Sequence, residues 1–274
     1  MLRSSLVKVL VTALVLAELR WAPEPYAMLL AWLTALLGVA FLTWAVMWPS
    51  AQFFVPSQWR VATDRAQVFL TFDDGPDPRF TPAILDVLAR HRAHATFFIV
   101  GARAAAHPEV VRRIAAEGHA IGTHTHGHAL RFHFSSPRQM RGEIERGIAA
   151  VAAVTGRPAR LFRPPQGLKT PMLRDALSGL GLECVTWSAR GFDTQARSAS
   201  QITERLERWL RPGAIVTLHD GAGLGGSDDR SATVEALDRL LTLASERGLH
   251  CDTLTEPSVG AASAAAPLPQ AEAA

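Results

Sequence analysis

The sequence predicts an α/β protein built on a parallel sheet and preceded by a hydrophobic helix. Two observations support this prediction. From about residue 66 to 255, short apolar segments of strand type alternate with segments of helical periodicity. Ahead of them, residues 26–48 carry no charged side chain. Strands that alternate with helices form parallel sheets, which are either closed as a barrel or open.

Seven apolar segments have the length and composition of strands. Between them, Thr81 with Pro82 and Ser136 with Pro137 have the pattern of an N-cap followed by the first helical residue. Glycines stand where helices are expected to end. The predicted strands are residues 68–72, 96–100, 120–123, 160–163, 183–187, 215–218 and 250–254, and the glycines are Gly118, Gly156 and Gly248.

Composition excludes several classes of protein. Of the 274 residues, 48% are hydrophobic and 19% are charged, which argues against a mainly disordered chain. Two cysteines are too few for a disulfide scaffold or a four-cysteine zinc module. The net charge is +3, and the basic residues form no stripe, so we expect no nucleic-acid partner.

Residues 26–48 are predicted to form a transmembrane helix. A helix of 23 uncharged residues is about 34 Å long, enough to cross a hydrocarbon core of about 30 Å. Tyr26 lies at one end, and Trp44 and Trp48 lie at the other, where interfacial aromatic residues are common. The membrane is therefore an expected partner.

A second apolar segment, residues 6–19, leaves the topology open. Its longest uncharged run has nine residues, too few to span a bilayer unless the helix extends and its ends snorkel. With one span, Arg3, Lys8 and Arg20 place the amino terminus in the cytoplasm and the rest of the chain outside. With two spans, the chain returns to the cytoplasm. A third interpretation of the segment is a signal-peptide h-region, although no clean small-x-small cleavage site follows it. We prefer the single span, with the following domain on the outer, periplasmic or extracellular side of the cell membrane.

The chain is divided by composition into four parts. Residues 1–49 form the membrane segment, residues 50–65 a linker, and residues 66–255 the α/β domain. Residues 256–274 hold 8 Ala and 3 Pro, a composition that predicts a disordered tail.

Polar side chains follow the first and third predicted strands. TFDDGP at 71–76 places the carboxylates of Asp73 and Asp74 at a strand end, where the sites of parallel sheets are built. HTHGH at 124–128 supplies three imidazoles, in which His124 and His128 share a face if the turn is helical. Such a cluster suits zinc or a similar ion.

Three later strand ends add further polar groups. RPPQG contains Arg163, which can hold a carboxylate by a bidentate contact. WSARGFD contains Asp193, and LHDG contains His219. Each has an ordinary explanation as a turn residue, but independent turns are not expected to place a suitable side chain at five separate strand ends.

The ordered set TFDDGP, HTHGH, RPPQG, WSARGFD and LHDG resembles the five motifs of the polysaccharide deacetylases of the NodB-homology type, carbohydrate esterase family 4. ATFFIVG at 95–101 agrees with the same pattern. The resemblance covers residues 66–255. It implies a distorted (β/α)7 barrel and metal-dependent removal of an N-acetyl group from an amino sugar.

The resemblance also implies roles for individual residues. Asp74, His124 and His128 correspond to the metal ligands, with Zn²⁺ as the expected cofactor. His126 matches a variable position and is not counted as a ligand.

The remaining motif residues correspond to the acid–base groups. Asp73 corresponds to the general base and Arg163 to the group that holds its carboxylate. His219 corresponds to the general acid, with Asp193 stabilising its charged form. A backbone N–H near Gln166 corresponds to a donor that stabilises the oxyanion.

The sequence departs from the family pattern at three places. Gln166 stands where many relatives have an aromatic residue, and Arg190 and Thr194 stand where the fourth motif usually has an Asp and a Trp. The expected substrate is an N-acetylated amino-sugar polymer such as peptidoglycan, a chitin-like chain or an exopolysaccharide. One alternative is a lipid-linked amino sugar that carries an acetyl or formyl group. Another is a non-catalytic relative that only binds carbohydrate.

Overall fold

The structure is a computed structural model that describes residues 2–23, 25–196, 198–223 and 228–254. The predicted disordered tail at 256–274 therefore lies outside the described residues.

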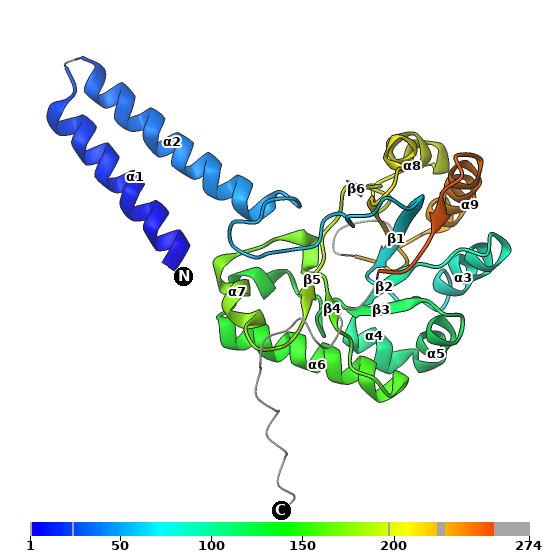
Figure 1. Cartoon of the computed structure of the whole chain (residues 1–274). Helices are drawn as coiled ribbons and strands as arrows, with labels where there is room; N and C mark the ends of the chain where they lie inside the picture. Colours follow the sequence, from blue (N-terminus) through cyan, green and yellow to red (C-terminus); the bar gives the residue numbers. More distant parts are fainter. Residues whose placement is uncertain (1, 24, 197, 224–227, 255–274) are drawn as a thin grey trace, which may run out of the picture.

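A parallel sheet forms the centre of the α/β domain (Figure 1). The strands are hydrogen-bonded in the order β5-β4-β3-β2-β1-β7-β6, and β8 pairs with the start of β1. Most buried side chains of the central strands β1, β2 and β7 are apolar, as is typical of parallel sheets covered by helices. The strands are β1 Gln67–Asp73, β2 Thr96–Ile99, β3 Ala120–Thr123, β4 Leu161–Phe162, β5 Glu183–Cys184, β6 Ala189–Arg190, β7 Ile215–His219 and β8 His250–Cys251.

The sheet curls toward a barrel because β5 and β6 stand at opposite ends of the strand order while only four residues separate them in the chain. The expected distorted barrel is thus confirmed. The strand predicted at 183–187 is wrong in its extent, and β6 was missed. The Thr186 N–H donates to the Gln58 carbonyl and the Thr186 carbonyl accepts from the Arg163 side chain, so this backbone leaves the ladder.

Helices follow one another round the outside of the sheet (Figure 1). Ser136 caps its helix as predicted, with a reciprocal bond to Gln139, and Gly156 ends it in the left-handed conformation. Thr81 is not the N-cap, which is Phe80; the Thr81 hydroxyl accepts from the Asp77 N–H and donates to the Asp220 carboxylate. The α-helices are α3 Thr81–Arg90, α4 Gly101–Ala106, α5 Pro108–Ala116, α6 Pro137–Thr155, α7 Pro171–Leu177, α8 Ala199–Leu206 and α9 Ser231–Glu246, and the 3-10 helices are η1 Leu130–Phe134, η2 Pro165–Gly167 and η3 Glu207–Trp209.

The amino-terminal part forms a helical hairpin of α1, Leu2–Trp21, and α2, Tyr26–Met47 (Figure 1). A Cβ added at Gly38 would lie 2.8 Å from a methyl group of Val11, and the Thr34 hydroxyl donates to Glu18 at 2.7 Å. Among the described helices only α2, with a mean hydropathy of 2.1, is long and apolar enough to cross a membrane. The helix predicted at 26–48 is thus present, and α1 packs along it.

Residues 50–65, expected to be a linker, pack against the barrel. Phe54 and Val55 are buried in a cluster that also holds Ala45 of α2 and residues of α6 and α7. The fully buried Lys169 ammonium donates to the carbonyls of Pro49, at 2.7 Å, and Ala51, and to the Ser57 hydroxyl at 3.0 Å. Hydrogen bonds therefore join the end of α2 to the α/β domain.

Candidate active site

The motif residues meet at the carboxyl edge of the sheet. Asp73 ends β1 and His219 ends β7, and the register of the two strands pairs these residues. Asp73, Asp74, His124, His128 and His219 line one pocket. The structure thus brings together five of the seven side chains that the sequence singled out, and Arg163 and Asp193 lie directly behind them.

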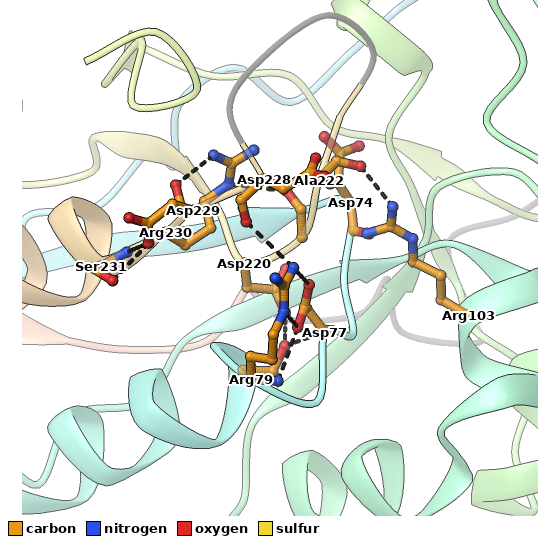
Figure 2. A network of polar contacts seen from close by, with 12 residues as sticks. Asp74, Asp77, Arg79, Arg103, Asp220, Ala222, Asp228, Asp229, Arg230 and Ser231 are labelled. Carbon is orange, nitrogen blue, oxygen red and sulfur yellow. Dashed lines mark hydrogen bonds and ion pairs between the residues drawn. The ribbon is translucent and has the colours of Figure 1, made fainter. Parts of the chain in front are cut away.

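The turn after β1 directs the two neighbouring carboxylates differently. Asp74 has a left-handed φ of 74°, which costs an L-residue energy and needs support from its surroundings. That support comes from Arg103 on α4, which donates to the Asp74 carbonyl at 2.6 Å and to the Ala222 carbonyl at 2.6 Å (Figure 2). Arg103 thereby ties the Asp74 turn to the loop after β7.

A buried carboxyl group supports the same turn from below. Asp220 accepts from the Thr81 hydroxyl at 2.6 Å, and a Cβ added at Gly75 would overlap the Asp220 carboxylate. Burial raises the pKa of Asp220 to about 7, and the nearby Asp74 adds to that effect. Sequence reasoning missed Asp220, although it follows His219 directly in the LHDG motif.

Asp74, His124 and His128 offer three ligand atoms within 4.8 Å of one another. Asp74 Oδ1 lies 3.1 Å from His128 Nε2 and 3.6 Å from His124 Nε2. His124 Nδ1 donates to the Arg163 carbonyl at 2.7 Å, which leaves the Nε2 lone pair directed at the carboxylate. Burial and the neighbouring His124 lower the pKa of His128 to about 4, so its ring is neutral at pH 7.

These residues fit a divalent cation. Asp74 Oδ1 is buried and has no hydrogen-bond partner, and a second acceptor faces it from His124. Two acceptors at that spacing are stabilised by a cation between them. One carboxylate and two imidazoles are a zinc-type ligand set. A Cβ added at Gly101 would lie 2.8 Å from His126 Nδ1, so the His126 ring packs against α4, apart from this set.

Asp73 is held by a buried arginine. Arg163 is fully buried and donates to Asp73 Oδ1 at 2.7 Å, and also to the Thr71 hydroxyl and the Thr186 carbonyl. Burial alone would raise the pKa of Asp73, but the Arg163 guanidinium and its hydrogen bond hold that pKa below its usual range. Asp73 is therefore ionised at neutral pH and can accept a proton.

His219 forms the second buried pair of the site. Its Nδ1 lies 2.8 Å from Asp193 Oδ1, and Asp193 Oδ2 accepts from the His219 N–H and the Thr233 hydroxyl. Burial opposes the charged imidazole, but the Asp193 carboxylate outweighs it and raises the pKa of His219. Because Nδ1 is bonded to Asp193, Nε2 is the ring nitrogen that remains available to a group bound in the pocket.

Gln166 reaches the pocket from η2 with a left-handed φ of 50°. Its side-chain oxygen lies 3.1 Å from Nε2 of the buried His133, which also lies 2.9 Å from the Pro165 carbonyl. His133 therefore orients Gln166. Sequence reasoning missed His133 because it belongs to no motif and lies 33 residues from its partner.

The arrangement agrees with comparisons to known proteins. A family profile described as polysaccharide deacetylase matches residues 60–185. A chitooligosaccharide deacetylase of Sinorhizobium fredii is 37% identical over 202 residues, which are 72% of this chain and 94% of that protein. A peptidoglycan-N-acetylglucosamine deacetylase of Bacillus cereus is 34% identical over 200 residues, covering 72% and 91% of the two chains.

A solved structure shows the same fold. The peptidoglycan N-acetylglucosamine deacetylase Bc1960 superposes with a TM-score of 0.66 at 33% identity, over 72% of this chain and 89% of that one. The motif resemblance is thus confirmed. This chain belongs to the polysaccharide deacetylase family, and its relatives named as deacetylases support a hydrolase that acts on N-acetyl amide bonds of carbohydrates.

Proposed function

We propose that this chain is a membrane-anchored, metal-dependent deacetylase that hydrolyses the N-acetyl groups of an amino-sugar polymer and releases acetate. One observation carries the proposal. The pocket that holds the three candidate metal ligands also holds two acid–base groups. Each of these has its own partner of opposite charge: Asp73 is paired with Arg163, and His219 is paired with Asp193. Amide hydrolysis needs one group that accepts a proton and another that donates one.

Asp74, His124 and His128 would hold the metal. A bound Zn²⁺ polarises an amide carbonyl and acidifies water at neutral pH. The His124 ring is held in its ligand tautomer by the bond from Nδ1 to the Arg163 carbonyl.

Asp73 is the proposed general base. Its carboxylate is ionised and is fixed by Arg163, so one oxygen stays available to take a proton from the attacking water. The water oxygen then forms a bond to the acetamide carbon.

His219 is the proposed general acid. Because the Asp193 carboxylate outweighs burial and raises the pKa of His219, the protonated imidazole is favoured and can deliver its proton from Nε2 to the leaving nitrogen. The C–N bond breaks, the sugar amine leaves, and acetate carries the carbonyl carbon with the oxygen of the water.

The relatives support an amino-sugar polymer as substrate, since their names specify chitooligosaccharides or peptidoglycan. The α2 helix supports membrane attachment. We place the domain on the outer side of the cell membrane, where the basic residues near the amino terminus and a single span would leave it.

The packed hairpin favours a second candidate. If α1 crosses the membrane beside α2, the domain returns to the side of the amino terminus, and a lipid-linked amino sugar becomes the substrate. A reporter fused to the carboxyl terminus separates the two candidates. Activity of a reporter that works only in the periplasm would support the polymer as substrate. Activity of a reporter that works only in the cytoplasm would support the glycolipid as substrate.

Acetate release tests the activity itself. The full chain in detergent is incubated with N-acetylglucosamine oligomers and with peptidoglycan, first with a chelator and then with added zinc. We expect the chelator to abolish acetate release and zinc to restore it. Release that continues unchanged in the chelator would contradict metal dependence, and zinc binding without release from any of these substrates would contradict the polymer.

A further inference from the structure

Arg190 is a charged side chain of the pocket that the proposed mechanism does not use. It belongs to β6 and pairs in register with Thr217 of β7, two residues before His219. Arg190 and Thr217 line the same pocket as Asp73 and His219. Neighbouring strands lie about 4.8 Å apart, and two residues along a strand span about 6.6 Å. A group bound by Arg190 would therefore lie within about one sugar ring of the acid–base groups.

The charges of the site leave Arg190 without a counterpart. Asp73 is paired with Arg163, and Asp193 is paired with His219. Asp74 faces the imidazoles and the expected metal. Within the described residues, the Arg190 side chain makes no hydrogen bond or ion pair, and its Nε is buried without a partner. The other guanidinium nitrogens of Arg190 are not among the buried atoms, and the side chain lines the pocket, so their N–H donors are available to an acceptor supplied by a ligand.

Aromatic rings fix the position of this guanidinium. Its carbon lies 5.7 Å from the centroid of the Trp187 ring and 5.4 Å from that of Phe192. These contacts stabilise the planar group by cation–π attraction. Phe192 has a left-handed φ of 51° and is 49% exposed. A strained, half-exposed aromatic residue beside an unpaired cation is typical of a binding surface.

We propose that Arg190 binds an anionic oxygen group, a carboxylate or a phosphate, that the substrate carries on or next to the amino sugar being deacetylated. The proposal rests on the proposed function. A guanidinium presents a planar fork of N–H donors that matches both anions. The carboxylate would come from an acidic sugar within a polymer, and the phosphate from the head of a glycolipid.

Matched substrates test the proposal. Acetate release by the full chain in detergent is measured with chitotetraose, with the same oligomer oxidised to a carboxylate at its reducing end, and with the oligomer carrying a reducing-end phosphate. The variants are Arg190→Gln, Arg190→Lys and the control Arg208→Gln. Arg208 stacks on Trp209 in the same way, at 6.0 Å, but lies outside the pocket.

We expect Arg190→Gln to raise KM for an anionic oligomer about ten- to hundred-fold while kcat stays unchanged, as the loss of a charge-assisted hydrogen bond requires. KM for chitotetraose should stay unchanged. Arg190→Lys should recover part of the loss, and Arg208→Gln should change nothing. Whichever anionic oligomer shows the effect identifies the carboxylate or the phosphate as the group that is bound.

Two results would overturn the proposal. One is an equal rise of KM for neutral and anionic oligomers, which would make Arg190 a contact for any sugar. The other is a wild-type protein without preference for either anion, which would leave the deacetylase function intact. If no oligomer is deacetylated, the proposed function fails, and calorimetric binding of the same oligomers to the wild type and Arg190→Gln decides the charge preference separately.

Discussion

Two buried cations only six residues apart in the chain have different surroundings. Arg163, at the carboxyl edge of the sheet, is paired with the Asp73 carboxylate. Lys169 lies where the segment after α2 packs against the α/β domain, and its ammonium contacts only neutral oxygens of Pro49, Ala51 and Ser57. Burial of a charge therefore does not mark an active site by itself. The distinguishing property is whether the partner is an ionised group facing the pocket.

The two environments act differently on their side chains. Arg163 keeps its charge and lowers the pKa of a carboxylate that faces the pocket. For Lys169, burial without an anionic partner lowers the pKa to about 8. Arg163 therefore serves the chemistry, while Lys169 joins two parts of the fold.

The largest loss of activity is expected from removing one of the candidate metal ligands. Asp74→Ala or His128→Ala removes one of three ligand atoms, so zinc binding and acetate release should fall together to background. Zinc content after dialysis and acetate release measure both. His126→Ala, from the same HTHGH motif but outside the ligand set, should keep the metal and the activity.

Removing Arg163 should cost both stability and activity. Arg163→Met leaves Asp73 buried without its cation, which should lower the free energy of unfolding by about 3–5 kcal/mol. The pKa of Asp73 should rise, so the acid limb of kcat/KM should move to higher pH. Denaturant unfolding and a pH profile measure these changes. An unchanged acid limb in a folded variant would show that Arg163 does not control the ionisation of Asp73.

Removing Lys169 should cost stability alone. Lys169→Met removes one donor from each of three oxygens, of which the Pro49 carbonyl and the Ser57 hydroxyl keep the Thr186 hydroxyl as a partner, and it should lower the free energy of unfolding by about 1–3 kcal/mol. The kcat of the folded protein should match the wild type, since Lys169 does not line the pocket. A large loss of kcat without loss of stability would contradict the purely structural role of Lys169.

The smallest expected effect is the pH dependence of the stability that Lys169 contributes. The pKa of Lys169 is about 8 in the folded protein and 10.5 as a reference value. Between these values the unfolded chain binds more protons, so raising the pH favours the folded state. The stability of the wild type relative to Lys169→Met should rise over this interval. Denaturant unfolding of both proteins at pH 7.5 and 9.5 measures this difference in stability. A difference that falls with rising pH would show that burial does not lower the pKa of Lys169.

The sequence predicted one of these regions and not the other. The motif residues could be found because each follows an apolar strand, and parallel strands bring their carboxyl ends to one edge. Asp193 was found through its motif although the strand before it, β6, was missed, and the structure places it against His219. Lys169 could not be found, because its oxygen partners lie 112–120 residues earlier in a segment that reads as a linker.

Other details depend on contacts between distant residues. The short β6 was missed because the Arg163 side chain and Gln58 take the backbone bonds that a continuous strand would use. Thr81 has the pattern of an N-cap, yet its hydroxyl bonds Asp220, 139 residues away. Local patterns thus predicted the elements, and tertiary hydrogen bonds decided their ends.

The central claim is that Asp73 accepts the proton while Asp74, His124 and His128 hold the metal. It is tested most directly by measuring zinc affinity and acetate release in the same preparation of Asp73→Asn. We predict wild-type zinc affinity and a turnover lower by about 10²–10⁴-fold, the usual contribution of a general base. Near-normal turnover with zinc bound would contradict the assignment of Asp73 as the base.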